Sequence, residues 1–139
     1  MKTQFECKIK YTKIDEKTGK EKRVTETYLV DAINFSEAET RIYTEMEKYI
    51  SGEFTVLDIK RANYTDVWSD IGERFYHCRV SFMSIDEAAG KEKKVTNSIL
   101  ALADNVDDAS NKVKQGLSGM TVDFETVSVA ESKIIDVFV

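Results

Sequence analysis

The stretch KIDEKTGKEKRVTETYL, residues 13–29, returns later in the chain as SIDEAAGKEKKVTNSIL, residues 84–100. The two copies share the pattern IDE-x-x-GKEK-[KR]-VT at a spacing of 71 residues, and this offset holds from Cys7 and Cys78 to Ala38 and Ala109. Beyond the helical region the offset becomes 70, where DVW at 66–68 matches DVF at 136–138. We therefore interpret the chain as a single domain made of two repeats, at about residues 4–70 and 75–139.

The start of each repeat alternates between apolar and polar residues, which predicts a strand with one buried face. The apolar positions are Phe5, Cys7, Ile9 and Tyr11 in the first repeat and Tyr76, Cys78, Val80 and Phe82 in the second. A short polar turn with a glycine follows each strand, at residues 15–20 and 86–91. These turns predict β-hairpins whose second strands cover about residues 21–32 and 92–103.

A helical pattern follows each hairpin. Ser36 and Glu39 fit a capping box in the first repeat, and Asp107 is expected to cap a shorter helix in the second. The positions expected to face inward are Ala38, Ile42, Met46, Tyr49 and Ile50 in the first helix and Ala109, Val113 and Leu117 in the second. The spacing thus predicts one amphipathic helix in each repeat.

The remaining segments, 53–68 and 122–138, are rich in β-forming residues, and each suits either one bent strand or two short ones. The C-terminal IIDVFV matches residues 64–68, so a buried strand is expected there rather than a free tail. The chain contains no proline, which suits long strands. The sequence predicts an α+β fold with an internal duplication of a β-β-α-β(β) unit, in which one or two antiparallel sheets pack against two helices.

The composition favours a soluble protein with one sizeable core, since 42% of the 139 residues are hydrophobic. No run of 18 apolar residues is present and the N-terminal stretch is charged, so no membrane contact and a cytoplasmic location are expected. Cys7 and Cys78 occupy the same repeat position, which favours two small buried core residues over a disulfide.

No residue pattern indicates catalysis. His77 is the only histidine and is expected on an exposed strand face, so no nucleophile has an evident base. The cysteines lack zinc-site spacing, and no glycine-rich phosphate loop occurs. The acidic pairs 15–16 and 107–108 are better explained as turns and caps than as calcium ligands. We expect no enzyme, no catalytic residue, no metal and no cofactor.

The charge pattern points to nucleic acid instead. The net charge is −5, yet residues 8–23 carry seven basic residues against three acidic ones, a local charge of +4. Basic grooves with aromatic faces are typical of proteins that bind single strands. The candidate contacts are Lys8, Lys10, Lys22, Arg23, Lys60, Arg61, Arg79, Lys91, Lys93 and Lys94, with Tyr64 and Trp68 stacking on bases.

Three stretches carry a resemblance to a known family: FECKIKYTK (5–13), VTETYLVDAINFSEAETRI (24–42) and ISGEFTVLDIKRANYTDV (50–67). They resemble an uncharacterised family encoded by Bacteroidetes and their tailed phages, including crAss-like phages. When taken from residue 53, the order of elements also resembles a permuted Whirly-type fold, which implies binding of single-stranded DNA.

The leading hypothesis is therefore a non-enzymatic, sequence-tolerant single-stranded-DNA-binding protein of phage or mobile-element replication. RNA as the ligand, a replication or virion protein as a partner, and a homo-oligomer formed through strand edges all stay open. The alternative is a small adaptor that binds another protein through a sheet edge or the acidic helix face between Glu37 and Glu47. A small nuclease would need a clustered acidic site, which the sequence does not indicate.

Overall fold

The computed structural model describes residues 3–120 and 123–139, without the side chain of Asp86. The elements in chain order are β1 (Thr3–Ile14), β2 (Glu21–Ala32), α1 (Phe35–Glu47), β3 (Phe54–Ala62), β4 (Asp66–Trp68), β5 (Arg74–Asp86), β6 (Lys91–Ala103), α2 (Val106–Gly116), β7 (Phe124–Glu131) and β8 (Ile134–Phe138). Both repeats follow the order β-β-α-β-β, and each of the segments 53–68 and 122–138 forms two strands. The predicted α+β class is confirmed.

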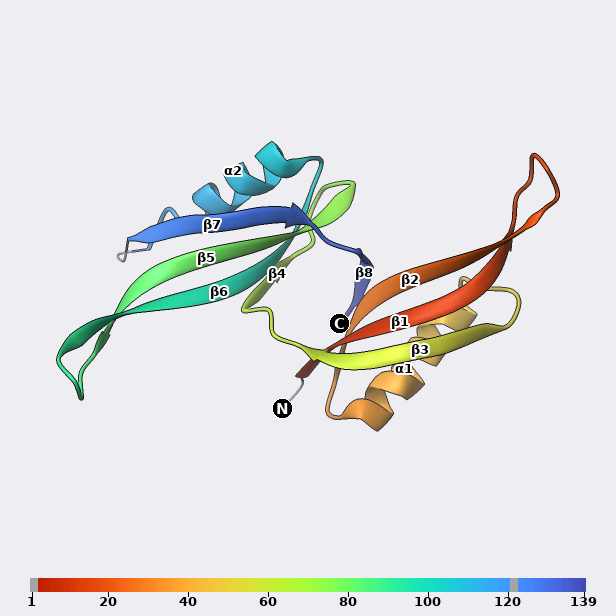
Figure 1. Cartoon of the computed structure of the whole chain (residues 1–139), viewed down its shortest axis with the longest axis horizontal. Helices are drawn as coiled ribbons and strands as arrows, with labels where there is room; N and C mark the ends of the chain where they lie inside the picture. Colours follow the sequence, from red (N-terminus) through yellow and green to blue (C-terminus); the bar gives the residue numbers. More distant parts are fainter. Residues whose placement is uncertain (1–2, 121–122) are drawn as a thin grey trace. The chain divides into compact units, whose positions relative to one another are not determined.

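The chain divides into two compact units, and the division does not follow the repeats. Unit 1 contains the residues up to Ala62 together with Lys133–Val139, and unit 2 contains Asn63–Ser132. The sheet of unit 1 has the strand order β3-β1-β2-β8, and that of unit 2 has the order β4-β6-β5-β7 (Figure 1). The fourth strand of each sheet therefore comes from the repeat that builds the other unit.

The two exchanged strands occupy the same register in their sheets. Val67 of β4 pairs with Leu100 of β6, and Val137 of β8 pairs with Leu29 of β2. Both pairings are parallel, whereas the other strand pairs in these sheets are antiparallel. Leu29 and Leu100 are repeat equivalents, and so are Val67 and Val137. Each repeat therefore adds the same strand to the same position of the other repeat's sheet.

Two long hairpins form the centre of each sheet, as predicted. In β1–β2 the antiparallel register runs without a break from Thr3 opposite Ala32 to Ile14 opposite Glu21. Gly19 closes the turn with a φ of 69°, and its counterpart Gly90 has a φ of 63°. These left-handed values explain why both turns use glycine. The second strands, Glu21–Ala32 and Lys91–Ala103, agree with the predicted ranges within one residue.

The helix of each unit covers one sheet face (Figure 1). The core of unit 1 consists of Phe5, Cys7, Ile9, Tyr28, Val30, Ala32, Ala38, Ile42 and Met46. The core of unit 2 consists of Tyr76, Cys78, Val80, Ile99, Ala101, Ala103, Ala109, Val113 and Leu117. The predicted strand and helix faces are largely confirmed, and both cysteines are free and buried. Among the described residues, no helix has the length and apolar character needed to cross a membrane.

The helix caps differ from the prediction. The side chain of Asn34, rather than Ser36, caps α1 by accepting a hydrogen bond from the Glu37 N–H at 2.9 Å. Asn105 rather than Asp107 caps α2 in the same way. In both cases the extended backbone of the asparagine directly precedes the first helical turn, which is the geometry a cap requires.

Tyr49 is not a core residue. The sequence placed it on the inward face of the helix, but α1 ends at Glu47 and Tyr49 is 70% exposed. Ile50 also follows Glu47 but packs against the core of unit 1, as predicted, so the prediction is wrong at Tyr49 alone among the five positions.

Candidate nucleic-acid interface

Each sheet has a face that does not carry the core residues packed by the helix, which we call the helix-free face. Lys8 lies on this face in unit 1 because its strand neighbours Cys7 and Ile9 are in the core. Arg79 lies on the corresponding face of unit 2, between the core residues Cys78 and Val80. Both cations are exposed.

Two cationic positions recur on the helix-free faces. Lys8 pairs with Thr27 across the β1–β2 ladder, and its repeat equivalent Arg79 pairs with Ser98 across β5–β6. Arg23 on β2 and its equivalent Lys94 on β6 lie closer to the hairpin ends and are also exposed. Each unit thus presents two cations with a hydroxyl side chain directly opposite the first.

The acidic residues of this face are not repeated. Glu6, Asp31 and Asp58 lie on the helix-free face of unit 1, and unit 2 has His77, Leu102 and Ser128 at the equivalent positions. Glu21 and Glu92 do recur, but they belong to the hairpin ends. Away from the hairpin ends, the charge that both units keep on this face is positive.

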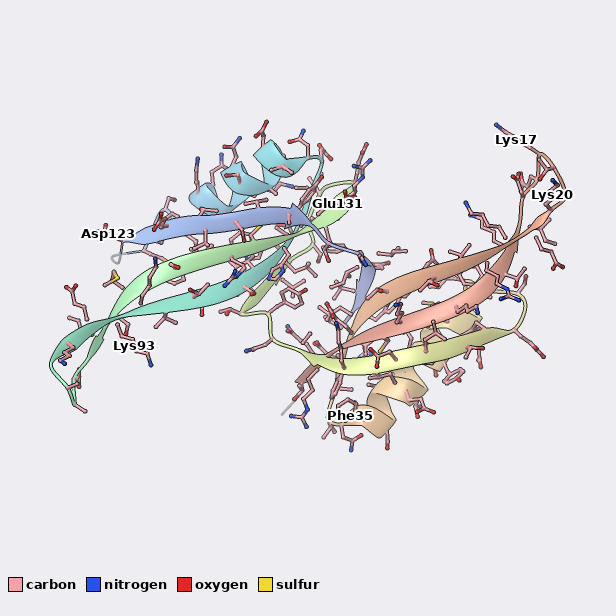
Figure 2. All side chains as sticks on the ribbon, in the orientation of Figure 1. Lys17, Lys20, Phe35, Lys93, Asp123 and Glu131 are labelled. Carbon is pink, nitrogen blue, oxygen red and sulfur yellow. The ribbon has the colours of Figure 1, made fainter. Side chains whose placement is uncertain are left out.

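The hairpins add two more recurring cations. Lys20 and Lys22 are equivalent to Lys91 and Lys93, and all four are exposed. Figure 2 shows Lys20 at the end of the β1–β2 hairpin and Lys93 on the β5–β6 hairpin. Within the part of the chain that the structure describes, none of the recurring cations forms an ion pair. These exposed cations are the candidate phosphate contacts that both units share.

Three other predicted cations are less available or do not recur. Lys60 lies 3.4 Å from the Glu6 carboxylate, measured from Nζ to Oε2. The Arg61 guanidinium stacks over Phe35 at 5.6 Å from the ring centroid. Lys10 is half-buried, and the second repeat has a serine at its position. These residues are specific to unit 1.

The two predicted stacking residues lie in unit 2, where they have different surroundings. Trp68 packs against the core of unit 2, and its indole lies so close to Gly116 that a Cβ there would come within 2.7 Å of Cη2. Tyr64 meets the His77 ring edge to face, with centroids 5.4 Å apart. His77 is half-buried rather than exposed, and its Nε2 lies 2.9 Å from Ser98 Oγ. Trp68 is therefore partly buried against the core of unit 2.

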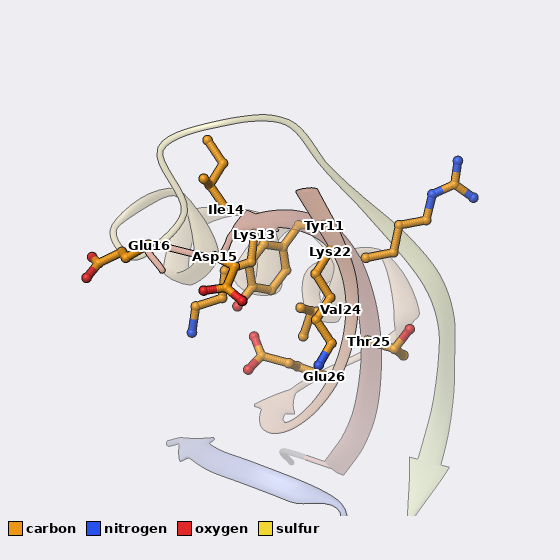
Figure 3. Close-up of a pocket in the computed structure, with 10 residues that line it drawn as sticks. Tyr11, Lys13, Ile14, Asp15, Glu16, Lys22, Val24, Thr25 and Glu26 are labelled. Carbon is orange, nitrogen blue, oxygen red and sulfur yellow. The ribbon is translucent and has the colours of Figure 1, made fainter. Parts of the chain in front are cut away.

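A feature that the sequence analysis missed is a pocket on the β1–β2 hairpin, which we call the hairpin pocket (Figure 3). It has a volume of about 760 Å³ and is lined by Tyr11, Lys13, Ile14, Asp15, Glu16, Lys22, Arg23, Val24, Thr25 and Glu26. The Tyr28 hydroxyl donates a hydrogen bond to Glu26 Oε1 at 3.2 Å. The available signal was Glu26 itself, a carboxylate on the strand face that carries Val24, Tyr28 and Val30.

Both phenols around Glu26 stay protonated at neutral pH. Burial raises the pKa of Tyr28, and the adjacent Glu26 carboxylate raises it further. Partial burial and the same carboxylate raise the pKa of Tyr11. The phenol groups are therefore hydrogen-bond donors that help to hold the Glu26 side chain.

Unit 2 has a pocket at the equivalent place with different chemistry. It has a volume of about 830 Å³ and is lined by Phe82, Met83, Ser84, Ile85, Glu92, Val95, Asn97, Met120 and Asp123. Phe82 replaces Tyr11, and Asn97 replaces Glu26. The carboxylate held by tyrosines is thus particular to unit 1.

The described residues contain no group of three or more histidine, cysteine, aspartate or glutamate side chains that could hold a metal ion. The acidic pairs instead serve the backbone. Asp15 accepts a hydrogen bond from the Lys17 N–H at 2.9 Å, and Asp108 accepts one from the Asp104 N–H at 3.0 Å.

A family model described as Domain of unknown function (DUF4494) matches residues 3–139, which is nearly the whole chain. Among curated proteins, none matches the sequence.

Proposed function

The chain belongs to the family described as Domain of unknown function (DUF4494), and because that description names no activity, we propose from the site geometry that the protein is a non-enzymatic, sequence-tolerant binder of single-stranded DNA. A role in the replication of a phage or mobile element is part of the same proposal. It rests on the resemblance of the three sequence stretches to the Bacteroidetes and phage family.

The observation that carries the proposal is the pair of cationic positions that recur on the helix-free faces. Lys8 and Arg79 lie centrally on their sheets, and each faces a hydroxyl side chain across the ladder. Cations and hydroxyl groups are the side chains that most often contact phosphate oxygens. The protein is acidic but keeps cations at equivalent positions of both units, although Lys8 faces Asp58 across β1–β3 where Arg79 faces Ser128. These cations give a phosphate backbone a recurring positive position on each sheet.

The single-stranded form is favoured by the aromatic side chains beside one of these tracks. His77 lies on the helix-free face of unit 2, two residues before Arg79 on β5, and Tyr64 packs against it. Stacking on an aromatic ring requires an unpaired base, and each stacked base contributes about 1–3 kcal/mol. In the proposed contact set, His77 therefore takes the place of Trp68, and Tyr64 is kept.

The test is fluorescence anisotropy of a labelled oligothymidine at several salt concentrations, with the wild type and Lys8→Glu/Arg79→Glu. The wild type should bind at low salt, with an affinity that falls as salt rises, because phosphate contacts release counterions. The double variant should bind about tenfold or more weakly, with a shallower salt dependence. The matched control is Lys48→Glu, since Lys48 is exposed at the end of α1 and pairs with Glu45.

Two results would overturn the proposal. One is a wild type that binds no oligonucleotide at low salt, and the other is a double variant that binds as well as the wild type while the fold is intact by circular dichroism.

A specific groove favours protein binding as the second candidate. A cavity of about 410 Å³ lies between α1 and the edge strand β3, lined in part by Phe35, Tyr43 and Leu57, which are 46%, 37% and 49% exposed. Glu39 lines the same groove, so an extended segment with an apolar anchor and a basic residue would fit it. If this candidate is right, the wild type should bind a protein partner that Leu57→Lys does not bind. The protein should then show no salt-dependent affinity for DNA.

A further inference from the structure

We propose that the hairpin pocket of unit 1 receives one base of the bound strand and selects guanine, an inference that rests on the proposed function. Glu26 and Tyr28 lie on the sheet face of Ile9, opposite to the face of Lys8, and Arg23 of the helix-free face also lines the pocket at the hairpin. The pocket thus adds a base-reading position beside cations that hold phosphates without regard to sequence.

The selecting group is the Glu26 carboxylate. Guanine carries two adjacent donors, N1–H and the N2 amino group, and a carboxylate can accept both with its two oxygens. No other DNA base presents two adjacent donors on its pairing edge. The Tyr28 and Tyr11 hydroxyls both donate to the Glu26 carboxylate and fix it. A carboxylate has about four acceptor positions, so two are left for the base.

The Tyr11 ring supplies the stacking face. It lines the pocket together with Lys13 and Glu26 and is only partly buried (Figure 3). A base that stacks on this ring would lie within reach of Glu26. Stacking of this kind tolerates any base, so the preference comes from the carboxylate.

Cations at the pocket serve the phosphates that flank the base. Lys13, Lys22 and Arg23 line the pocket, opposed by the carboxylates of Asp15, Glu16 and Glu26. Asp15 and Glu16 belong to the exposed turn, where Asp15 already accepts the Lys17 N–H. Glu26 is the half-buried carboxylate of the set, so it is the one positioned to read a base that has entered.

The second repeat provides an internal comparison. Its pocket has Phe82 in place of Tyr11 and Asn97 in place of Glu26, while Ile99 replaces Tyr28. An asparagine amide both donates and accepts, so it does not match the paired donors of guanine. Guanine selection therefore belongs to unit 1 alone.

The test uses oligothymidines that differ at one central base, which is thymine, guanine, adenine or hypoxanthine. Wild type should bind the guanine strand about tenfold more tightly than the thymine strand. Hypoxanthine lacks the N2 amino group and should recover only part of this gain. Glu26→Asn, which copies the second repeat, should bind the guanine and thymine strands equally. The matched control Asn97→Ala should keep the preference.

The outcomes separate this inference from the proposed function. Oligothymidine binding without a guanine preference, or a preference that survives in Glu26→Asn, overturns the guanine pocket and leaves DNA binding in place. No binding of any strand overturns both. If Glu26→Asn fails to fold, Glu26→Gln keeps an acceptor for Tyr28 and should lose the preference equally.

Discussion

Val137 pairs with Leu29, although the two residues belong to different repeats. Val67 pairs with Leu100 in the same register, in the opposite direction of exchange. Each repeat therefore depends on the other for the fourth strand of its sheet. A substitution in the last strand of one repeat should therefore lower the stability of the unit that the other repeat builds.

Phe138→Ala tests this exchange. The Phe138 ring stacks on Tyr28 with centroids 5.5 Å apart and packs against the core of unit 1. Loss of this partly buried ring should destabilise unit 1 by about 2 kcal/mol, below the range of a fully buried phenylalanine. Hydrogen exchange followed by mass spectrometry should show faster exchange in β1–β3, with β5–β7 little changed.

Trp68→Ala is the reciprocal control, because Trp68 packs against the core of unit 2. It should speed exchange in β5–β7 and leave β1–β3 near the wild-type rate. If either variant instead loosened the unit of its own repeat, the strand exchange would be wrong.

Gly72→Ala should be strongly destabilising. A Cβ at Gly72 would lie 2.3 Å from the backbone N of Ala103, a contact with main-chain atoms that cannot move aside easily. We expect a loss of at least about 2 kcal/mol in the free energy of unfolding, measured by urea denaturation. Gly52→Ala is the matched control, since a Cβ there would meet no atom within 4 Å. Equal stability of the two variants would contradict the close approach.

The repeat made the fold class, the hairpins and the core faces predictable from the sequence. Alternation at Phe5, Cys7 and Ile9 identifies a buried strand face because side chains on a strand alternate. The exchange of β4 and β8 was not predictable, because DVW and DVF are equally compatible with either sheet. Pairing between distant strands depends on where the chain turns after residue 62, and local pattern does not determine that.

The candidate site was predictable only in part. Lys8 and Arg79 stood out from their equivalent places in the repeat, and the structure puts them on the helix-free faces. The engagement of Arg61 with Phe35 depends on a strand and a helix start far apart in the sequence. The position of Trp68 was also not predictable from local sequence, because its packing against Gly116 follows from the strand exchange.

Stability should fall at alkaline pH because of the buried thiols. Burial raises the pKa of Cys7 from 9.0 to about 12 and that of Cys78 from 9.0 to about 11. Above about pH 9 the unfolded chain loses thiol protons that the folded protein retains, so the free energy of unfolding decreases as pH rises towards the folded pKa values. Urea titrations from pH 8 to pH 11 should show this decline.

Cys7→Ala/Cys78→Ala is the control for the alkaline decline, and its slope should be shallower. A residual decline above pH 10 is expected from Tyr28, whose pKa burial also raises. An unchanged slope in the double variant would show that the thiols do not cause the effect.

Charge reversal in the two hairpins should weaken DNA binding to a similar degree. Lys22 and Arg23 are repeat equivalents of Lys93 and Lys94, and all are exposed. If each pair contacts two phosphates, Lys22→Glu/Arg23→Glu and Lys93→Glu/Lys94→Glu should each lower the salt slope by about 1.4, and their effects on the logarithm of the affinity should add. Anisotropy titrations with oligothymidine measure both quantities.

The control is Lys17→Glu, because Lys17 is a cation at the same hairpin end (Figure 2) whose repeat equivalent is an alanine. This variant should change the affinity much less. A loss confined to one hairpin would mean that the ligand follows a single unit, and unchanged affinity in both double variants would remove the hairpins from the interface.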